Sequence, residues 1–123
     1  MFEINATVRI LSRPKLGGLL QHVGVELPEG RIAHCVPAKG AVITWPEEYA
    51  EGQDVTTIRE VCVPHGELMQ RLSSAITESR PYDPISWNCE VFASWLVGET
   101  PQSSQVNGLL AVGLVVAIAR IAS

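Results

Sequence analysis

Hydrophobic and polar residues alternate along the first part of the chain. From Phe2 to Ile10 every second residue is apolar, which is typical of a strand that buries one of its faces. This pattern places Ile4 on the buried face. The segment 13–18 contains a proline and two glycines and predicts a loop, in which we expect Arg13 to be solvated.

A second alternating stretch, from Leu20 to Val36, predicts a β-hairpin. Pro28 can begin its turn and Gly30 can adopt the left-handed conformation of a three-residue loop. This turn pairs Gly24 with His34 and His22 with Val36, so that both histidines lie on one face of the sheet. Two histidines on one strand face are usually half-exposed polar positions, and the pair alone does not identify a site.

The middle of the chain predicts two further strands and a helix. Residues 41–45 and 55–63 are rich in β-branched residues and predict strands, whereas the acidic stretch 46–54 between them predicts a solvated loop. Residues 65–79 carry apolar side chains at steps of four, as an amphipathic helix does. The pattern predicts an α+β fold, in which a small antiparallel sheet packs against helices.

The C-terminal part of the chain differs from the rest in composition. Residues 1–98 form the predicted folded domain, 99–107 a polar linker and 108–123 an apolar segment. As a helix of about 14 residues, 108–121 spans about 21 Å, which is shorter than the ~30 Å hydrocarbon core of a bilayer. Because it lacks a polar face, we expect it to be buried in the domain, packed in a homo-oligomer or associated with a membrane.

Composition narrows the class of protein. A chain of 123 residues corresponds to one domain, and its net charge of -4 excludes nucleic acid as a partner. Three cysteines without paired spacing do not form a disulfide framework, and the N-terminus shows no apolar core of a signal peptide. The sequence therefore predicts a cytoplasmic protein with free thiols.

The segment 87–98 predicts a short helix that begins with a cysteine. Asn88 is a good N-cap, Trp87 and Phe92 fit a hydrophobic staple, and Gly98 can end the helix. Cys89 then occupies the first helical position, where the helix dipole stabilises an anion and lowers the pKa of a thiol. The alternative is that Cys89 is a small buried hydrophobic residue, as most free cysteines are.

Cys89 together with the two histidines has the parts of a thiol-dependent acyl-transfer site. The thiolate attacks a carbonyl, an imidazole accepts and returns the proton, and a second polar group orients the imidazole. The N–H groups of the helix can hold the developing oxyanion. Cys35 and Cys62 lie in predicted strands, and we expect them to be structural.

Three blocks of the sequence resemble the lecithin retinol acyltransferase (LRAT)-like proteins, which are circularly permuted members of the papain-like NlpC superfamily. The blocks are Gln21 to Leu27, Ile32 to His34 and Asn88 to Phe92, and an Arg-Pro pair precedes the first of them. The resemblance extends from about residue 10 to residue 98. At Val91 the family usually has a histidine, and this departure weakens any inference of a lipid substrate.

The resemblance implies a circularly permuted papain-like fold with Cys89 as the nucleophile, His22 as the base and His34 orienting His22. We therefore expect a cysteine-dependent acyltransferase or hydrolase that forms an acyl-thioester and needs no cofactor. Its substrate would be a small-molecule, lipid or peptide acyl compound. Three alternatives remain: an NlpC-type peptidase or amidase, a zinc site formed by the same three residues, and a non-catalytic module.

Overall fold

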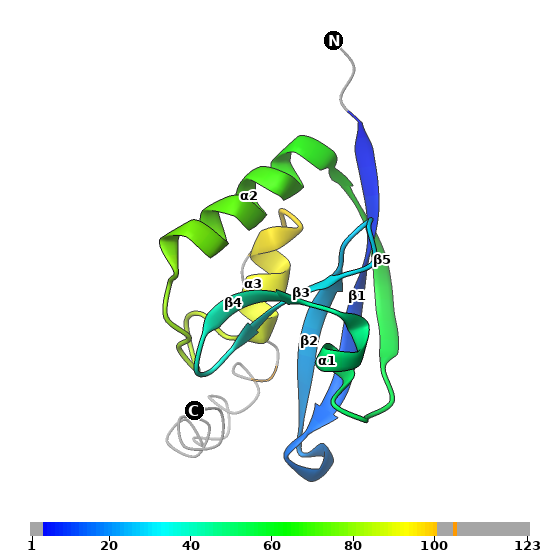
Figure 1. Ribbon diagram of the computed structural model, residues 1–123, viewed down its shortest axis with the longest axis vertical. Helices are drawn as coiled ribbons and strands as arrows, with labels where there is room; N and C mark the ends of the chain where they lie inside the picture. Colours follow the sequence, from blue (N-terminus) through cyan, green and yellow to red (C-terminus); the bar gives the residue numbers. More distant parts are fainter. Residues whose placement is uncertain (1–3, 101–104, 106–123) are drawn as a thin grey trace.

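The fold is a five-stranded antiparallel sheet packed with helices, in the strand order β4-β3-β2-β1-β5 (Figure 1). The computed structural model describes residues 4–100 and residue 105. Its elements in chain order are β1 (Asn5–Lys15), the 3-10 turn η1 (Leu16–Gly18), β2 (Leu20–Glu26), β3 (Ile32–Val36), β4 (Gly40–Thr44), α1 (Pro46–Ala50), β5 (Thr56–Pro64), α2 (His65–Glu78) and α3 (Cys89–Leu96). The predicted α+β class with an antiparallel sheet is thus confirmed.

Helices cover both faces of the sheet. Helices α2 and α3 pack over the larger core, which includes Ala33 and Cys35 of β3. The alternate residue Ile32 packs instead with Tyr49 of α1 in a second, smaller core. Gly24 of β2 also faces Tyr49, because a Cβ atom at this glycine would lie 2.7 Å from the tyrosine ring. The second core therefore depends on a residue without a side chain at position 24.

The predicted hairpin forms with the expected turn and register. Gly24 pairs with His34, the Leu27 amide donates to Arg31 O at 2.8 Å, and Gly30 has a φ of 103°. The predicted pair of His22 with Val36 is wrong, because the ladder between β2 and β3 ends at Gly24. The first residues of β2 therefore present a backbone edge that β3 does not cover.

The loop predicted at 13–18 is wrong for its first half, because β1 continues to Lys15. Pro14 pairs with Gln21 of β2, and the peptide groups of Gln21 point away from β1. No ladder hydrogen bond is needed from the position of Pro14, so the strand tolerates a proline there. At the other end Ile4 is 75% exposed, not buried, because it precedes the first paired residue of β1.

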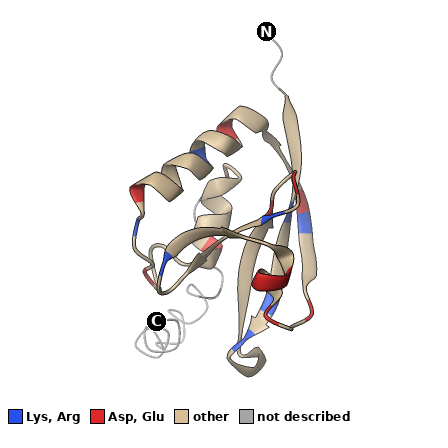
Figure 2. Ribbon diagram, in the orientation of Figure 1, with Lys and Arg blue, Asp and Glu red and all other residues tan. Residues whose placement is uncertain are grey.

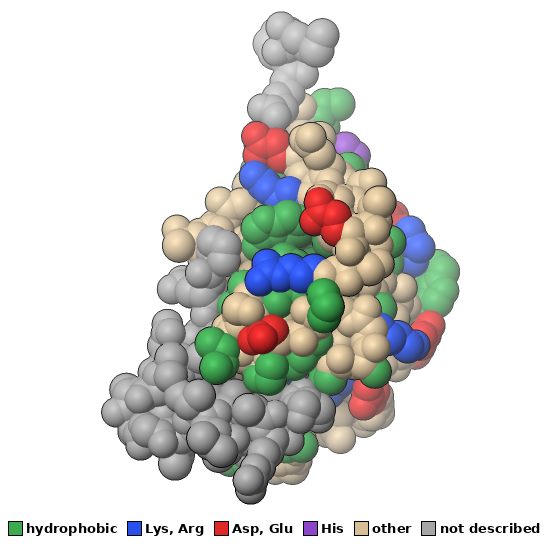
Figure 3. Space-filling model, turned by 90° about the vertical axis from the view of Figure 1, so that its left-hand side faces the viewer, with side chains coloured by type: hydrophobic (Ala, Val, Ile, Leu, Met, Phe, Trp, Pro, Cys, Tyr) green, Lys and Arg blue, Asp and Glu red, His purple; other side chains and the backbone are tan. Residues whose placement is uncertain are grey.

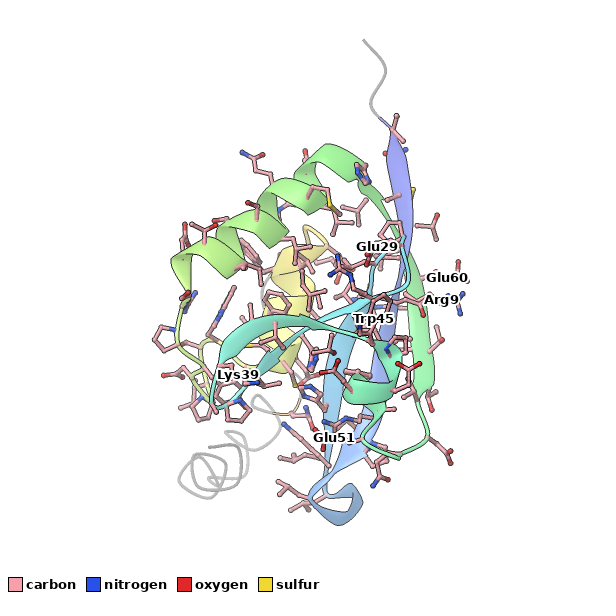
Figure 4. All side chains as sticks on the ribbon, viewed as in Figure 1. Arg9, Glu29, Lys39, Trp45, Glu51 and Glu60 are labelled. Atoms are coloured by element: carbon pink, nitrogen blue, oxygen red, sulfur yellow. The ribbon has the colours of Figure 1, made fainter. Side chains whose placement is uncertain are left out.

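The acidic stretch predicted as a loop contains helix α1. Pro46 begins the helix, and Glu47 and Glu48 lie in its first turn, where acidic side chains complement the helix dipole (Figure 2). Glu51 and Trp45 flank the helix, and Tyr49 is fully buried (Figure 4). The prediction was wrong because a single buried side chain holds an otherwise solvated helix.

The surface is mixed in character. On the side seen in Figure 3, basic and acidic side chains interrupt the hydrophobic ones. None of the helices in the described part of the chain is long and apolar enough to cross a membrane. The apolar segment 108–123 lies outside the described residues, as does most of the linker 99–107, so their expected roles stay predictions.

Candidate active site

Helix α3 begins as the sequence predicts. The side chain of Asn88 accepts a hydrogen bond from the Val91 amide at 3.0 Å, and its own amide group donates to Pro84 O at 2.9 Å. The rings of Trp87 and Phe92 meet edge to face with centroids 5.7 Å apart, which confirms the hydrophobic staple. These contacts fix the direction in which the first turn leaves the preceding loop.

The thiol of Cys89 reaches the open edge of β2. Its Sγ atom lies 3.8 Å from Gln21 O, and the backbone N–H groups of Val23 and Glu90 are hydrogen-bonded to it. The residue is 2% exposed. Helix α3 thus places the thiol against the backbone of Gln21 and Val23, the two neighbours of His22 in β2. His22 is the residue that the sequence resemblance assigns as the base.

The expected low pKa of Cys89 is not what the structure shows. Burial raises the pKa of this thiol above its ordinary value, which the charge of Lys15 and the N–H groups of Val23 and Glu90 only partly oppose. Burial dominates because the sulfur is enclosed between α3 and the sheet. In this state Cys89 carries a neutral thiol at neutral pH.

His22 and His34 lie on one face of the sheet, as predicted, and contact each other directly. The His22 Nε2 and His34 Nδ1 atoms are 2.8 Å apart, and His34 Nε2 lies 2.9 Å from the hydroxyl of Thr44. Both rings are buried, so the two histidines are not the half-exposed positions that such a pair usually forms. The three side chains form a continuous chain of hydrogen bonds from β2 across β3 to β4.

Burial also keeps both imidazoles neutral. It lowers the pKa of His22 to about 2, helped by the charges of His34, Arg13 and Lys15. It lowers the pKa of His34 to about 4, helped by Arg13. The structure thus holds a neutral thiol on α3 and two neutral imidazoles on β2 and β3, and the lowered pKa makes His22 a weaker base than an exposed histidine.

Tyr49 forms the floor beneath the two histidines. Its ring lies 5.4 Å from that of His22 and 5.1 Å from that of His34, and its hydroxyl donates to His22 O at 2.6 Å. Arg13, expected in solvent, is buried: its guanidinium donates to Tyr49 O and pairs with Glu51 at 3.1 Å. Helix α1 is thereby held against β1 and supports the histidine rings.

The three predicted site residues, Cys89, His22 and His34, are not all in contact with one another in the same way. His22 and His34 are bonded to each other, whereas no hydrogen bond within the described residues joins the Cys89 thiol to either ring. Cys35 is buried and donates to Trp87 O at 3.5 Å, as a structural cysteine would. Cys62, which we also expected to be structural, is exposed on β5.

The positions of the candidate ligand side chains do not support the zinc alternative. Within residues 4–100 and residue 105, no three side chains of histidine, cysteine, aspartate or glutamate are grouped as metal ligands. One nitrogen of His22 and both nitrogens of His34 are already occupied by the hydrogen-bond chain. In this arrangement the ring nitrogens that face one another are therefore engaged in hydrogen bonds.

Sequence reasoning missed four participants: Thr44, Tyr49, the backbone of Gln21 and the side chain of Gln105, which hydrogen-bonds to the Gln21 backbone. A signal existed for Tyr49, because a proline followed by two glutamates marks a helix start around the only aromatic residue of that stretch. Thr44 is one of several hydroxyl residues in predicted strands. A peptide group has no signature in the sequence at all.

Comparisons with known proteins give no further guide. No protein-family model, no curated protein and no solved structure matches the chain.

The buried imidazoles make the stability of the fold sensitive to acid. An unfolded chain protonates His22 and His34 near pH 6.5, but the folded chain does so only at lower pH, so stability is lost as the pH falls below about 6.5. Each histidine contributes a slope of up to about 1.4 kcal/mol per pH unit. Urea unfolding between about pH 7 and pH 5 should show a shallower slope for His22→Gln than for the wild type. An unchanged slope for His22→Gln would show that burial of this imidazole does not make the fold sensitive to acid.

Proposed function

We propose that the protein is a cysteine-dependent acyltransferase or hydrolase that forms an acyl-thioester on Cys89, with His22 as the base and His34 as its positioning residue. One observation carries the proposal. The buried chain from His22 through His34 to Thr44 adjoins the same stretch of β2 whose backbone contacts the thiol. Burial of two neutral histidines is costly in a fold unless the pair is hydrogen-bonded, as this pair is.

The hydrogen-bond chain selects one tautomer for a working base. His22 can accept a proton on Nδ1 only if its Nε2 carries the hydrogen and donates it to His34 Nδ1. His34 must then carry its own hydrogen on Nε2 and donate it to Thr44. Thr44 is thus the end of the chain that sets the proton position at both rings.

In the first step of the proposed reaction, His22 Nδ1 takes the thiol proton as Sγ attacks the carbonyl carbon of the substrate. The tetrahedral intermediate carries an oxyanion, which the first-turn amide of Cys89 would stabilise, because the Val91 amide is bound by Asn88 and the Glu90 amide by the thiol. The intermediate collapses to the thioester as the leaving group departs with the proton from His22.

In the second step His22 removes a proton from the acyl acceptor, which is water in a hydrolase and an alcohol or amine in a transferase. The acceptor attacks the thioester carbon, and the second tetrahedral intermediate releases the acyl product. The thiolate then recovers its proton from His22. Because both groups begin neutral, proton transfer accompanies the attack and does not precede it.

We also propose that the fold is a circularly permuted papain-like one of the LRAT and NlpC type. The support is the resemblance of the His22, His34 and Cys89 blocks, together with the antiparallel sheet and the helix that begins at the nucleophile. The likeness of the sequence blocks supports the proposed family, and the hydrogen bond between the two histidines adds to that support.

Intact-mass measurement tests the proposal. The chain carrying Cys62→Ser, which silences the exposed thiol, should gain the mass of one acyl group when incubated with p-nitrophenyl acetate or an acyl thioester. The adduct should map to Cys89 and be absent from the matched Cys62→Ser/Cys89→Ala chain. If that chain acquires the same adduct, Cys89 is not the nucleophile. Absence of any adduct would favour the non-catalytic module, which the burial and raised pKa of Cys89 also suit.

A further inference from the structure

The open edge of β2 beside Cys89 is not empty. The side-chain carboxamide of Gln105 lies across the backbone of Gln21, accepting from the Gln21 amide at 2.8 Å and donating to Gln21 O at 3.2 Å. This is the pair of hydrogen bonds that a neighbouring strand residue would make with Gln21. The carboxamide thus fills the position that β3 leaves unpaired.

The position uses every polar atom of the carboxamide. The second hydrogen of Gln105 Nε2 is donated to Glu90 Oε1 at 3.0 Å, and the same oxygen accepts from the Gln105 backbone amide at 3.1 Å. A primary carboxamide offers one acceptor and two N–H hydrogens, and here all three find partners. An ester has no N–H at all, and a secondary amide in the trans form cannot present its oxygen and its hydrogen on the same side.

The carboxamide and the thiol share an atom. Gln21 O accepts from Gln105 Nε2 and lies 3.8 Å from Cys89 Sγ. Whatever occupies the position of the Gln105 side chain is therefore next to the nucleophile, and while Gln105 occupies it, a substrate group cannot. Glu90 is the residue after Cys89 in the first turn of α3. Its carboxylate, which accepts the second N–H hydrogen, is therefore held close to the nucleophile.

We propose that the Gln21 backbone and the Glu90 carboxylate form a binding position for a primary carboxamide of the substrate, which Gln105 occupies in the resting protein as an internal substitute. The proposal deepens the proposed function, because it assigns a substrate class to the site of Cys89. A substrate bearing a primary carboxamide displaces Gln105 and gains the same hydrogen bonds, whereas a plain lipid ester does not.

Three alkylating reagents that differ only in N–H hydrogens test the position without requiring turnover. Iodoacetamide carries two such hydrogens, its N-methyl derivative one and its N,N-dimethyl derivative none. Rates at Cys89 and at the exposed Cys62 are followed in the full chain by peptide mapping, so that Cys62 corrects for intrinsic reactivity. Alkylation of Cys89 reports the binding position even if no acyl-enzyme ever forms.

Removing the internal carboxamide should expose the position. In Gln105→Ala and in the equally long Gln105→Glu, which has lost both N–H donors, iodoacetamide should modify Cys89 about tenfold faster than in the wild type. The rate at Cys62 should not change. Gln70→Ala, a change at an exposed glutamine of α2, should leave both rates as in the wild type.

The order of the three reagents decides whether the position recognises a carboxamide. In Gln105→Ala the rate at Cys89, divided by the rate at Cys62, should fall about tenfold from iodoacetamide to the N,N-dimethyl reagent, with the N-methyl reagent between them. Equal ratios for the three reagents would overturn the proposal, because Gln105 would then only block access to Cys89. An unchanged Cys89 rate in both Gln105 variants would overturn it as well. Failure of acyl transfer with this order preserved would instead count against the proposed function alone.

Discussion

Alanine in place of His22 should slow acyl-adduct formation on Cys89 by ~10²–10⁴, the usual contribution of a general base. The reason is geometric: His22 is the ring on the strand that the thiol contacts, and its Nε2 is already occupied by His34. Only Nδ1 remains to exchange a proton with the thiol. Single-turnover mass measurement gives the rate, and thermal melting confirms that the variant is folded.

His34 should be replaceable where His22 is not. The atom that contacts His22 is His34 Nδ1, and the side-chain oxygen of asparagine lies at a similar distance from its backbone. His34→Asn can therefore still accept from His22 and should lose only about tenfold in rate, and His34→Ala should lose more. The exposed His65→Ala serves as the control. If His34→Asn is as inactive as His22→Ala, the two histidines do not have the roles assigned to them.

Truncation of Tyr49 should produce the largest loss of stability among these variants, about 3–5 kcal/mol for Tyr49→Ala. The side chain is fully buried, contacts both histidine rings and fills the space above Gly24. Tyr49→Phe keeps the ring but leaves His22 O without the hydroxyl, and should cost about 1–3 kcal/mol.

Urea unfolding at neutral pH measures both Tyr49 variants. Trp45→Ala provides the matched control, because it removes a larger aromatic side chain at the start of the same helix from an exposed position (Figure 4). Its effect should stay within about 0.5 kcal/mol. A Tyr49→Ala variant as stable as Trp45→Ala would show that α1 does not support the site.

Local features were predictable from the sequence. The turn at Pro28 to Gly30 and the cap at Asn88 each depend on a few adjacent residues, and both form as expected. The common face of His22 and His34 follows from the turn, because strand side chains alternate. Features that a single strand, turn or helix specifies by itself could therefore be predicted from the sequence.

Features that depend on tertiary contacts were not predictable from the sequence. The burial of Arg13 requires α1 to cross the end of β1, and nothing near position 13 in the sequence indicates that partner. The raised pKa of Cys89 comes from enclosure between α3 and the sheet, and this outweighs the helix terminus on which the sequence argument relied. The end of the ladder at Gly24 depends on how β2 and β3 separate, which no residue pattern records.

The exposed stretch of β2 has a consequence for how the site can vary among related chains. At position 21 the thiol and the carboxamide contact the amide hydrogen and carbonyl oxygen, which nineteen of the twenty amino acids supply in the same place. Proline alone lacks the hydrogen. Drift at this position would leave the chemistry untouched, so an alignment could show residue 21 as freely variable in a family whose members all bind through it.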